Sequence, residues 1–105
     1  MRVTAWSNGN PRPSGAGYGV RLSAADRDRH FDRSWTSIVL DLGAGEVTVV
    51  ALSASFWRRC AELRSASIGR WLLGRGLAPW PKGQPPRLVL RHLHGDRFQL
   101  RHPEK

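Results

Sequence analysis

The sequence predicts a small α+β domain with its elements in the order β-α-β-β-α-α-β-β. The chain has 105 residues and is 40% hydrophobic, which suits one core and leaves no room for a second. Apolar residues alternate or run together in five short segments, as in strands, and recur every three or four residues in three others, as in helices. We expect a five-stranded curled antiparallel sheet or a partly closed barrel, with a helical pair packed on one side.

The first part of the chain is expected to be mobile. Residues 7–17, SNGNPRPSGAG, are dominated by Gly, Pro, Asn and Ser and show no apolar period. We therefore predict a flexible N-terminal segment over residues 1–16 and a single globular domain over residues 17–102.

A strand and a helix open the predicted domain. Residues 18–22 alternate between apolar side chains and small or polar ones, which is the period of a half-buried strand. Ser23 can cap a helix over residues 24–31, and Asp26 can reach back to the amide of the cap. Two β-branched runs, residues 35–42 and 46–52, then predict a hairpin joined through GAG.

Residues 53–76 predict a pair of helices. Their apolar positions have the spacing of a helical stripe, with Phe56, Cys60 and Leu63 in the first and Ile68, Trp71 and Leu72 in the second. The turn between them would be SAS, without the Gly that is common in a helix-turn-helix. We therefore interpret the helices mainly as a structural element whose apolar side chains pack on the sheet, with the arginines on a solvated face.

Residues 87–101 form the most informative segment, a second predicted hairpin. With residues 94–96 as its loop, His92 lies opposite Phe98 and Leu93 lies opposite Arg97. One face then carries the apolar set Leu88, Leu90, His92, Phe98 and Leu100. The other face carries Arg87, Val89, Arg91, Leu93, Arg97, Gln99 and Arg101. A register shifted by one residue would mix apolar and basic side chains, so the first register is preferred.

The charge balance points to a polyanionic partner. Seventeen basic side chains against eight acidic ones give a net charge of +9, and nucleic acid is the commonest polyanion in a cell. Fifteen of the seventeen cations are Arg, a skew that codon usage in a GC-rich genome can also produce. Arginines that alternate along paired strands stand about 7 Å apart, which suits the phosphates of one nucleic-acid strand.

We therefore predict a non-enzymatic nucleic-acid-binding domain that needs no cofactor, with DNA slightly favoured over RNA. The predicted contact face consists of Arg87, Arg91, Arg97 and Arg101. Arg58, Arg59 and Arg70 are auxiliary candidates on the helices, and Trp80 is a candidate for stacking on a base.

Two alternatives belong to other classes of function. The first is a protein-interaction module in which Trp80, Leu93 and the stiff segment APWPKGQPP dock an acidic protein. The second is a metal-dependent nuclease, because His92 and His94 are two residues apart in a strand and could share a metal ion. A polar hairpin tip explains the two histidines more simply.

The remaining features concern the compartment. Cys60 is the single cysteine, so an intramolecular disulfide is impossible and a reducing compartment is expected. Residues 1–15 lack the apolar stretch of a secretory signal, and the apolar runs are far shorter than a bilayer span. These observations predict a soluble cytoplasmic protein with no membrane contact; they leave the oligomeric state open.

Overall fold

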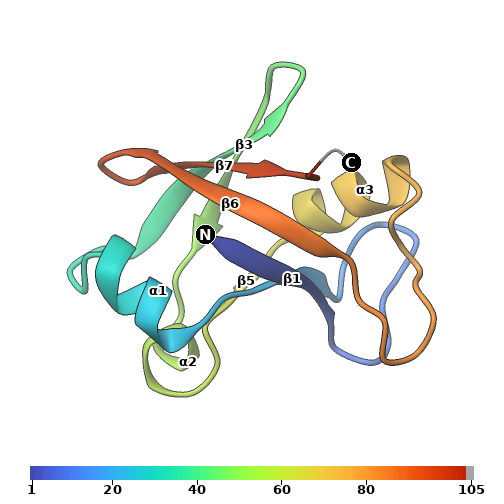
Figure 1. Cartoon of the computed structure of the whole chain (residues 1–105), viewed down its shortest axis with the longest axis horizontal. Coiled ribbons are helices and arrows are strands. Elements are labelled where there is room, and N and C mark those ends of the chain that lie inside the picture. The colour runs from blue at the N-terminus through green and yellow to red at the C-terminus, as the bar shows by residue number, and fades with distance from the viewer. Residues whose placement is uncertain (104–105) are drawn as a thin grey trace.

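The computed structural model describes residues 1–103 and shows an α+β fold with seven strands and three helices in that range (Figure 1). In chain order, the elements are β1 (Arg2–Ser7), β2 (Tyr18–Arg21), α1 (Ala24–His30), β3 (Ser37–Gly43), β4 (Glu46–Ala51), α2 (Ala54–Arg58), β5 (Glu62–Arg64), α3 (Ala66–Gly74), β6 (Arg87–His94) and β7 (Arg97–Arg101). The α+β class is therefore confirmed.

The strands form one mixed sheet in the order β4-β3-β7-β6-β1-β2-β5. Every neighbouring pair is antiparallel except β3 and β7, which run parallel. The two ends of this order, β4 and β5, approach each other, so the sheet curls into a nearly closed barrel. The predicted curling is confirmed, whereas the count of five strands and the all-antiparallel pairing are wrong.

The first extra strand is β1, which lies in the segment expected to be flexible. It is paired on both sides: Thr4 lies opposite Arg21 of β2 and opposite Arg87 of β6. Its inward side chains, Val3 and Ala5, are buried in the core. Residues 1–16 are therefore not a free tail, because their first half contributes a strand to the middle of the sheet.

The loop that follows β1 is fastened to α3. Gly15 of this loop lies against Gly69 of the helix so closely that a Cβ on Gly69 would stand 2.0 Å from the Gly15 carbonyl oxygen. The Asn8 amide also donates to the Gly17 carbonyl at 2.9 Å, which closes the loop at its base. The glycines that suggested a mobile segment thus allow the backbones of the loop and of α3 to come close together.

The second extra strand, β5, replaces the end of the first predicted helix. α2 stops at Arg58, and Cys60 is exposed rather than buried in a helical stripe. Leu63 is buried, but it reaches the core from a strand that pairs with β2. The seven-residue spacing from Phe56 to Leu63 fits a helix, yet it also arises here from a short helix followed by an alternating strand.

Helices close the barrel at its two ends. Figure 1 shows α1 and α2 together at one end and α3 at the other. At the first end, Phe31 stacks on Phe98 of β7 with ring centroids 4.6 Å apart and packs against Phe56 of α2 at 5.1 Å. At the second end, the Trp71 indole of α3 donates to the Leu42 carbonyl at 2.8 Å.

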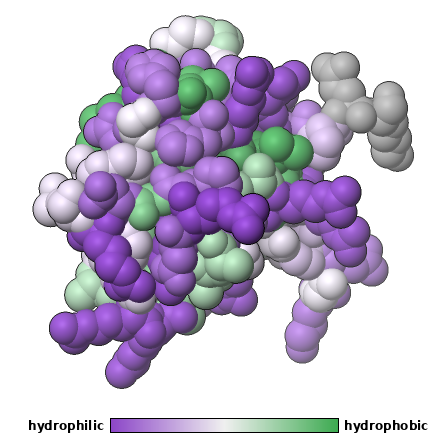
Figure 2. All heavy atoms as spheres, turned by 60° about the vertical axis from the view of Figure 1, so that its left-hand side comes forward, coloured by the Kyte–Doolittle hydropathy of each residue, from purple (hydrophilic) through white to green (hydrophobic). Residues whose placement is uncertain are grey.

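One face of the molecule is mainly polar (Figure 2). Figure 2 shows one face of the molecule, where long hydrophilic side chains project around small apolar areas. Within residues 1–103, no helix is long and apolar enough to cross a membrane.

Candidate nucleic-acid interface

The β6–β7 hairpin adopts the predicted register over most of its length. His92 lies opposite Phe98 and Leu90 opposite Leu100, as expected. The turn is tighter than expected, because His94 pairs with Arg97 and the register shifts between His92 and His94. Leu93 is therefore part of a bulge and does not pair with Arg97.

The hairpin separates its apolar and basic side chains. The inward residues Leu88, Leu90, Phe98 and Leu100 are fully buried in the barrel core. The outward residues Arg87, Arg91, Arg97 and Arg101 are exposed. This separation follows from the period of two along each strand, with the core on one face and solvent on the other.

β1 adds a fifth arginine that sequence reasoning did not select. Arg2 is exposed and lies opposite Val89 of β6, which in turn lies opposite Arg101 of β7. We call the exposed outer-face set Arg2, Arg87, Arg91, Arg97 and Arg101 the arginine belt. It spans three adjacent strands, and its diagonal neighbours across paired strands stand about 7–8 Å apart at their backbones. The alternation of Arg2 and Thr4 with Val3 and Ala5 was the signal that could have found Arg2.

The arginine belt is not neutralised by the acidic side chains of residues 1–103. The ion pairs in that range join Arg21 and Arg64 to Glu62, and Arg27 and Arg33 to Asp28. Two acids lie beside the belt: Asp96, which precedes Arg97 in the β6–β7 turn, and Asp41, which lies opposite Gln99 on β3. Neither forms an ion pair with a belt arginine, and the Asp41 carboxylate accepts a hydrogen bond from the Gly43 amide at 2.7 Å. The five guanidinium groups therefore face solvent with their charge available to an anion.

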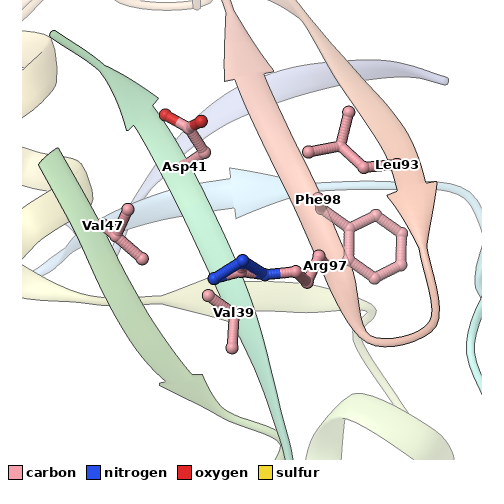
Figure 3. A pocket seen from close by; sticks show the side chains of 6 residues that line it. All are labelled: Val39, Asp41, Val47, Leu93, Arg97 and Phe98. Atoms are coloured by element: carbon pink, nitrogen blue, oxygen red, sulfur yellow. The ribbon is translucent and has the colours of Figure 1, made fainter. Parts of the chain in front are cut away.

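An apolar area adjoins the belt at Arg97. The large apolar side chains that stand out from the described surface are Val47, Val49 and Leu93, which are 52%, 66% and 41% exposed. With the half-buried Val39 they form what we call the apolar patch. Val39 lies between Val49 of β4 and Arg97 of β7 in the register of the sheet. Figure 3 shows the Arg97 side chain extending from β7 across β3 toward Val39.

At the β5 end of the sheet, the buried carboxylate of Glu62 holds two arginines. The Glu62 side chain is 2% exposed and accepts hydrogen bonds from Arg21 Nε at 2.9 Å and Arg64 Nη2 at 2.7 Å. Arg64 also stacks on the Trp6 ring, with its Cζ 4.6 Å from the ring centroid. Burial acts to raise the pKa of Glu62, but the bonds from Arg21 and Arg64 outweigh it, so the pKa is lowered. These two arginines therefore serve the fold rather than an external anion.

The structure does not bring the four auxiliary candidates into the belt. Arg58 and Arg59 are exposed at the end of α2, beside α1. Arg70 donates to the Ser14 carbonyl and to Ser67 Oγ, both at 3.1 Å, so it holds the 8–17 loop on α3. Trp80 is half-buried, and its ring lies 5.7 Å from that of Tyr18.

The two histidines of the hairpin do not share a site. His92 points inward and stacks on Phe98 at 4.4 Å, whereas His94 is exposed. His92 Nε2 lies 2.7 Å from the Gly95 carbonyl, and its Nδ1 lies 3.4 Å from His30 Nδ1 on α1. In the part of the chain that the structure describes, no three His, Cys, Asp or Glu side chains are grouped to hold a metal ion.

Comparison with protein-family models, with curated proteins and with solved structures finds no match to this chain. A planar guanidinium can bond two phosphate oxygens at once, and the sheet fixes the spacing of the three strands from which the five arginines project.

Proposed function

We propose that this protein is a non-enzymatic nucleic-acid-binding domain whose arginine belt holds the phosphates of its ligand. The observation that carries the proposal is the charge of the outer face: five exposed arginines on β1, β6 and β7, with no carboxylate partner among residues 1–103. Because β1, β6 and β7 are adjacent in the sheet, these charges act on one ligand together.

Phosphate binding of this kind has a measurable signature. Each phosphate that the protein neutralises releases condensed counterions, so the affinity for a duplex falls with a slope of about −0.9 per contact on a double-logarithmic salt plot. Full use of the belt predicts a slope of about −4 to −5 with duplex DNA. The ligand can be DNA or RNA, since both present the same phosphates, and both are included in the test.

The test compares two variants that remove the same charge from different places. Arg91→Gln/Arg97→Gln removes two belt arginines, while the control Arg58→Gln/Arg59→Gln removes two exposed arginines from α2. Fluorescence anisotropy with labelled DNA and RNA at several salt concentrations should show the slope reduced by about two in the belt variant and little changed in the control. Unchanged affinity of the belt variant, or an equal loss in both variants, would show that the belt is not the site.

The alternative of an acidic protein partner has one observation in its favour. Leu93 is 41% exposed next to the belt, as that alternative requires, although Trp80 packs against Tyr18. The length of the ligand separates the two functions. If the ligand is nucleic acid, the affinity should rise as the oligonucleotide is lengthened. If the ligand is an acidic protein, that protein should displace short and long oligonucleotides equally well.

A further inference from the structure

We infer that the nucleic acid bound by this protein is single-stranded, with its phosphates on the arginine belt and its bases on the apolar patch. This inference rests on the proposed function and names the ligand class for it. It starts from the position of the patch, which is continuous with the belt through the pairing of Val39 with Arg97. A ligand that lies along the belt and reaches Arg97 therefore meets Val39, Val47 and Val49 next.

Because the apolar patch adjoins the arginine belt, a ligand that covers both must have charged and apolar parts. Val47 and Val49 lie on the exposed side of β4. Val47 lines one hollow together with Val39, Leu93 and Arg97, and Val49 lies beside this hollow, opposite Val39. A contiguous group of exposed apolar side chains is typical of a binding surface rather than of a solvated face. Attraction between phosphates and arginines is enough to explain the belt, but it gives no role to the exposed Val47, Val49 and Leu93.

A single strand supplies both parts. Its bases are not enclosed in a stack of pairs, so each can turn its apolar ring face to the protein while its phosphate stays on an arginine. Strands are about 4.8 Å apart, so Val39 and Val49 lie about 5 and 10 Å from the β7 strand that carries Arg97. That is within reach of a base attached to the phosphate that Arg97 holds.

A duplex fits the same surface poorly. Its bases are stacked inside, and a sheet face laid against it meets phosphates, which would oppose the valines and bring no apolar contact. Entry into the major groove would need a ribbon such as the β3–β4 hairpin, which projects from the barrel in Figure 1. That hairpin has Asp41 and Glu46 and no basic residue, so the phosphates that flank a groove would repel it.

Asp41 also lines the hollow, so a ligand there would meet its carboxylate. Its carboxylate is engaged by the Gly43 amide at 2.7 Å, which fixes it toward the β3–β4 turn. A phosphate on Arg97 and a base on the valines can therefore pass on the side of Val39, away from that turn. The same carboxylate makes the hollow unsuitable for a phosphate, so the base is the part of the ligand that fits there.

The test uses Val47→Ser/Val49→Ser, which makes the patch polar at two exposed positions. Anisotropy is measured with labelled oligo(dT) and with a duplex of the same length. We expect wild-type protein to prefer oligo(dT), and the variant to lose about three- to tenfold of its affinity for oligo(dT) and none for the duplex, because it loses apolar contact with the bases. Two controls accompany it: Val47→Ile/Val49→Ile keeps the patch apolar, and Ala24→Ser/Ala25→Ser makes two exposed positions on α1 polar. Both should bind as wild type.

The outcomes separate the inference from the proposed function. Equal affinity for both ligands, or no loss on oligo(dT) in the serine variant, overturns the single-strand inference while the belt can still bind phosphates. An unchanged salt slope in Arg91→Gln/Arg97→Gln, or no binding of oligo(dT), of the duplex or of labelled RNA, overturns both. Equally tight binding of poly-L-glutamate, with the same sensitivity to the serine variant, assigns the surface to an acidic protein instead. Thermal unfolding of each variant shows that it is folded before binding is scored.

Discussion

Replacing Glu62 by Gln should weaken the fold at neutral pH, and the effect should shrink as the pH falls below the ordinary pKa of a glutamate. The Glu62 carboxylate is almost fully buried and joins Arg21 of β2 to Arg64 of β5, the last two strands of the barrel. Gln has nearly the same volume, so the change removes the charge without opening a cavity. The variant leaves two guanidinium groups without their anion and places an NH2 group among them.

The expected loss can be bounded from these contacts. Hydrogen bonds to a charged group contribute about 1.5–3 kcal/mol each, and breaking a fully buried ion pair costs about 3–5 kcal/mol. The Arg21 and Arg64 side chains are 56% and 55% exposed, so water can take over much of their solvation. We therefore expect a loss of about 1–2 kcal/mol in the free energy of unfolding at pH 7.

The stabilisation by Glu62 depends on pH. The pKa of Glu62 is lowered below 4.5 in the folded protein, so its ionised form stabilises the fold above that value. This stabilisation is lost as the pH falls through the lowered pKa, and wild type and Glu62→Gln should then converge. Urea unfolding followed by tryptophan fluorescence, at pH 7 and at a series of lower pH values, measures how the difference shrinks.

The control is Glu46→Gln, which removes an exposed carboxylate at the start of β4. It should change the free energy of unfolding by less than about 0.5 kcal/mol. Equal stability of Glu62→Gln and wild type at pH 7 would refute the role given to this carboxylate. A deficit that persists unchanged in acid would refute its electrostatic origin.

Two further predictions concern the packing of the helices. Burial, and to a smaller extent the charge of His92, lowers the pKa of His30 below 6.5, so the folded protein favours the neutral imidazole. The melting temperature should therefore be constant above pH 6.5 and fall as the pH drops below it. It should fall less in His30→Asn. If wild type and His30→Asn lose the same number of degrees, the histidine pair is not the cause. Gly69→Ala should destabilise the protein by about 2–4 kcal/mol, because the new Cβ would clash with the Gly15 carbonyl oxygen. The control is Gly74→Ala, whose Cβ would meet nothing within 4 Å, so that it should be neutral or slightly stabilising. Chemical denaturation compares the two, and equal effects would contradict the close contact.

The sequence predicted the elements whose signal is local. The β6–β7 hairpin alternates large apolar side chains with arginines around a Gly-containing turn, so its faces and the pairing of His92 with Phe98 followed from the pattern alone. β1 carries a shorter signal of the same kind, the alternation of Arg2 and Thr4 with Val3 and Ala5, and it was missed beside the Gly- and Pro-rich loop that follows. What the pattern could not predict is its place in the sheet, where β2 and β6 pair with it on both sides. That place is set by tertiary context.

The same distinction applies to the candidate site. Four members of the belt lie on one hairpin, and they could be grouped from a periodicity of two. Arg2 comes from a segment 85 positions away from Arg87 in the sequence, and only the strand order brings the two onto neighbouring strands. The helical spacing of Phe56, Cys60 and Leu63 misled for a related reason, because three residues of β5 carry too little pattern to outweigh a helical period.

The strand order also bears on how the chain is made. β1 is synthesised long before β6, the strand that it pairs with, and β3 is synthesised long before β7. Pairing of segments so distant in sequence is slow to form. Until β6 and β7 have been synthesised, β1 and β3 therefore each have one unpaired edge. Translation stalled after α3 would leave a half-built sheet, and this is the stage at which we expect the protein to depend most on chaperones.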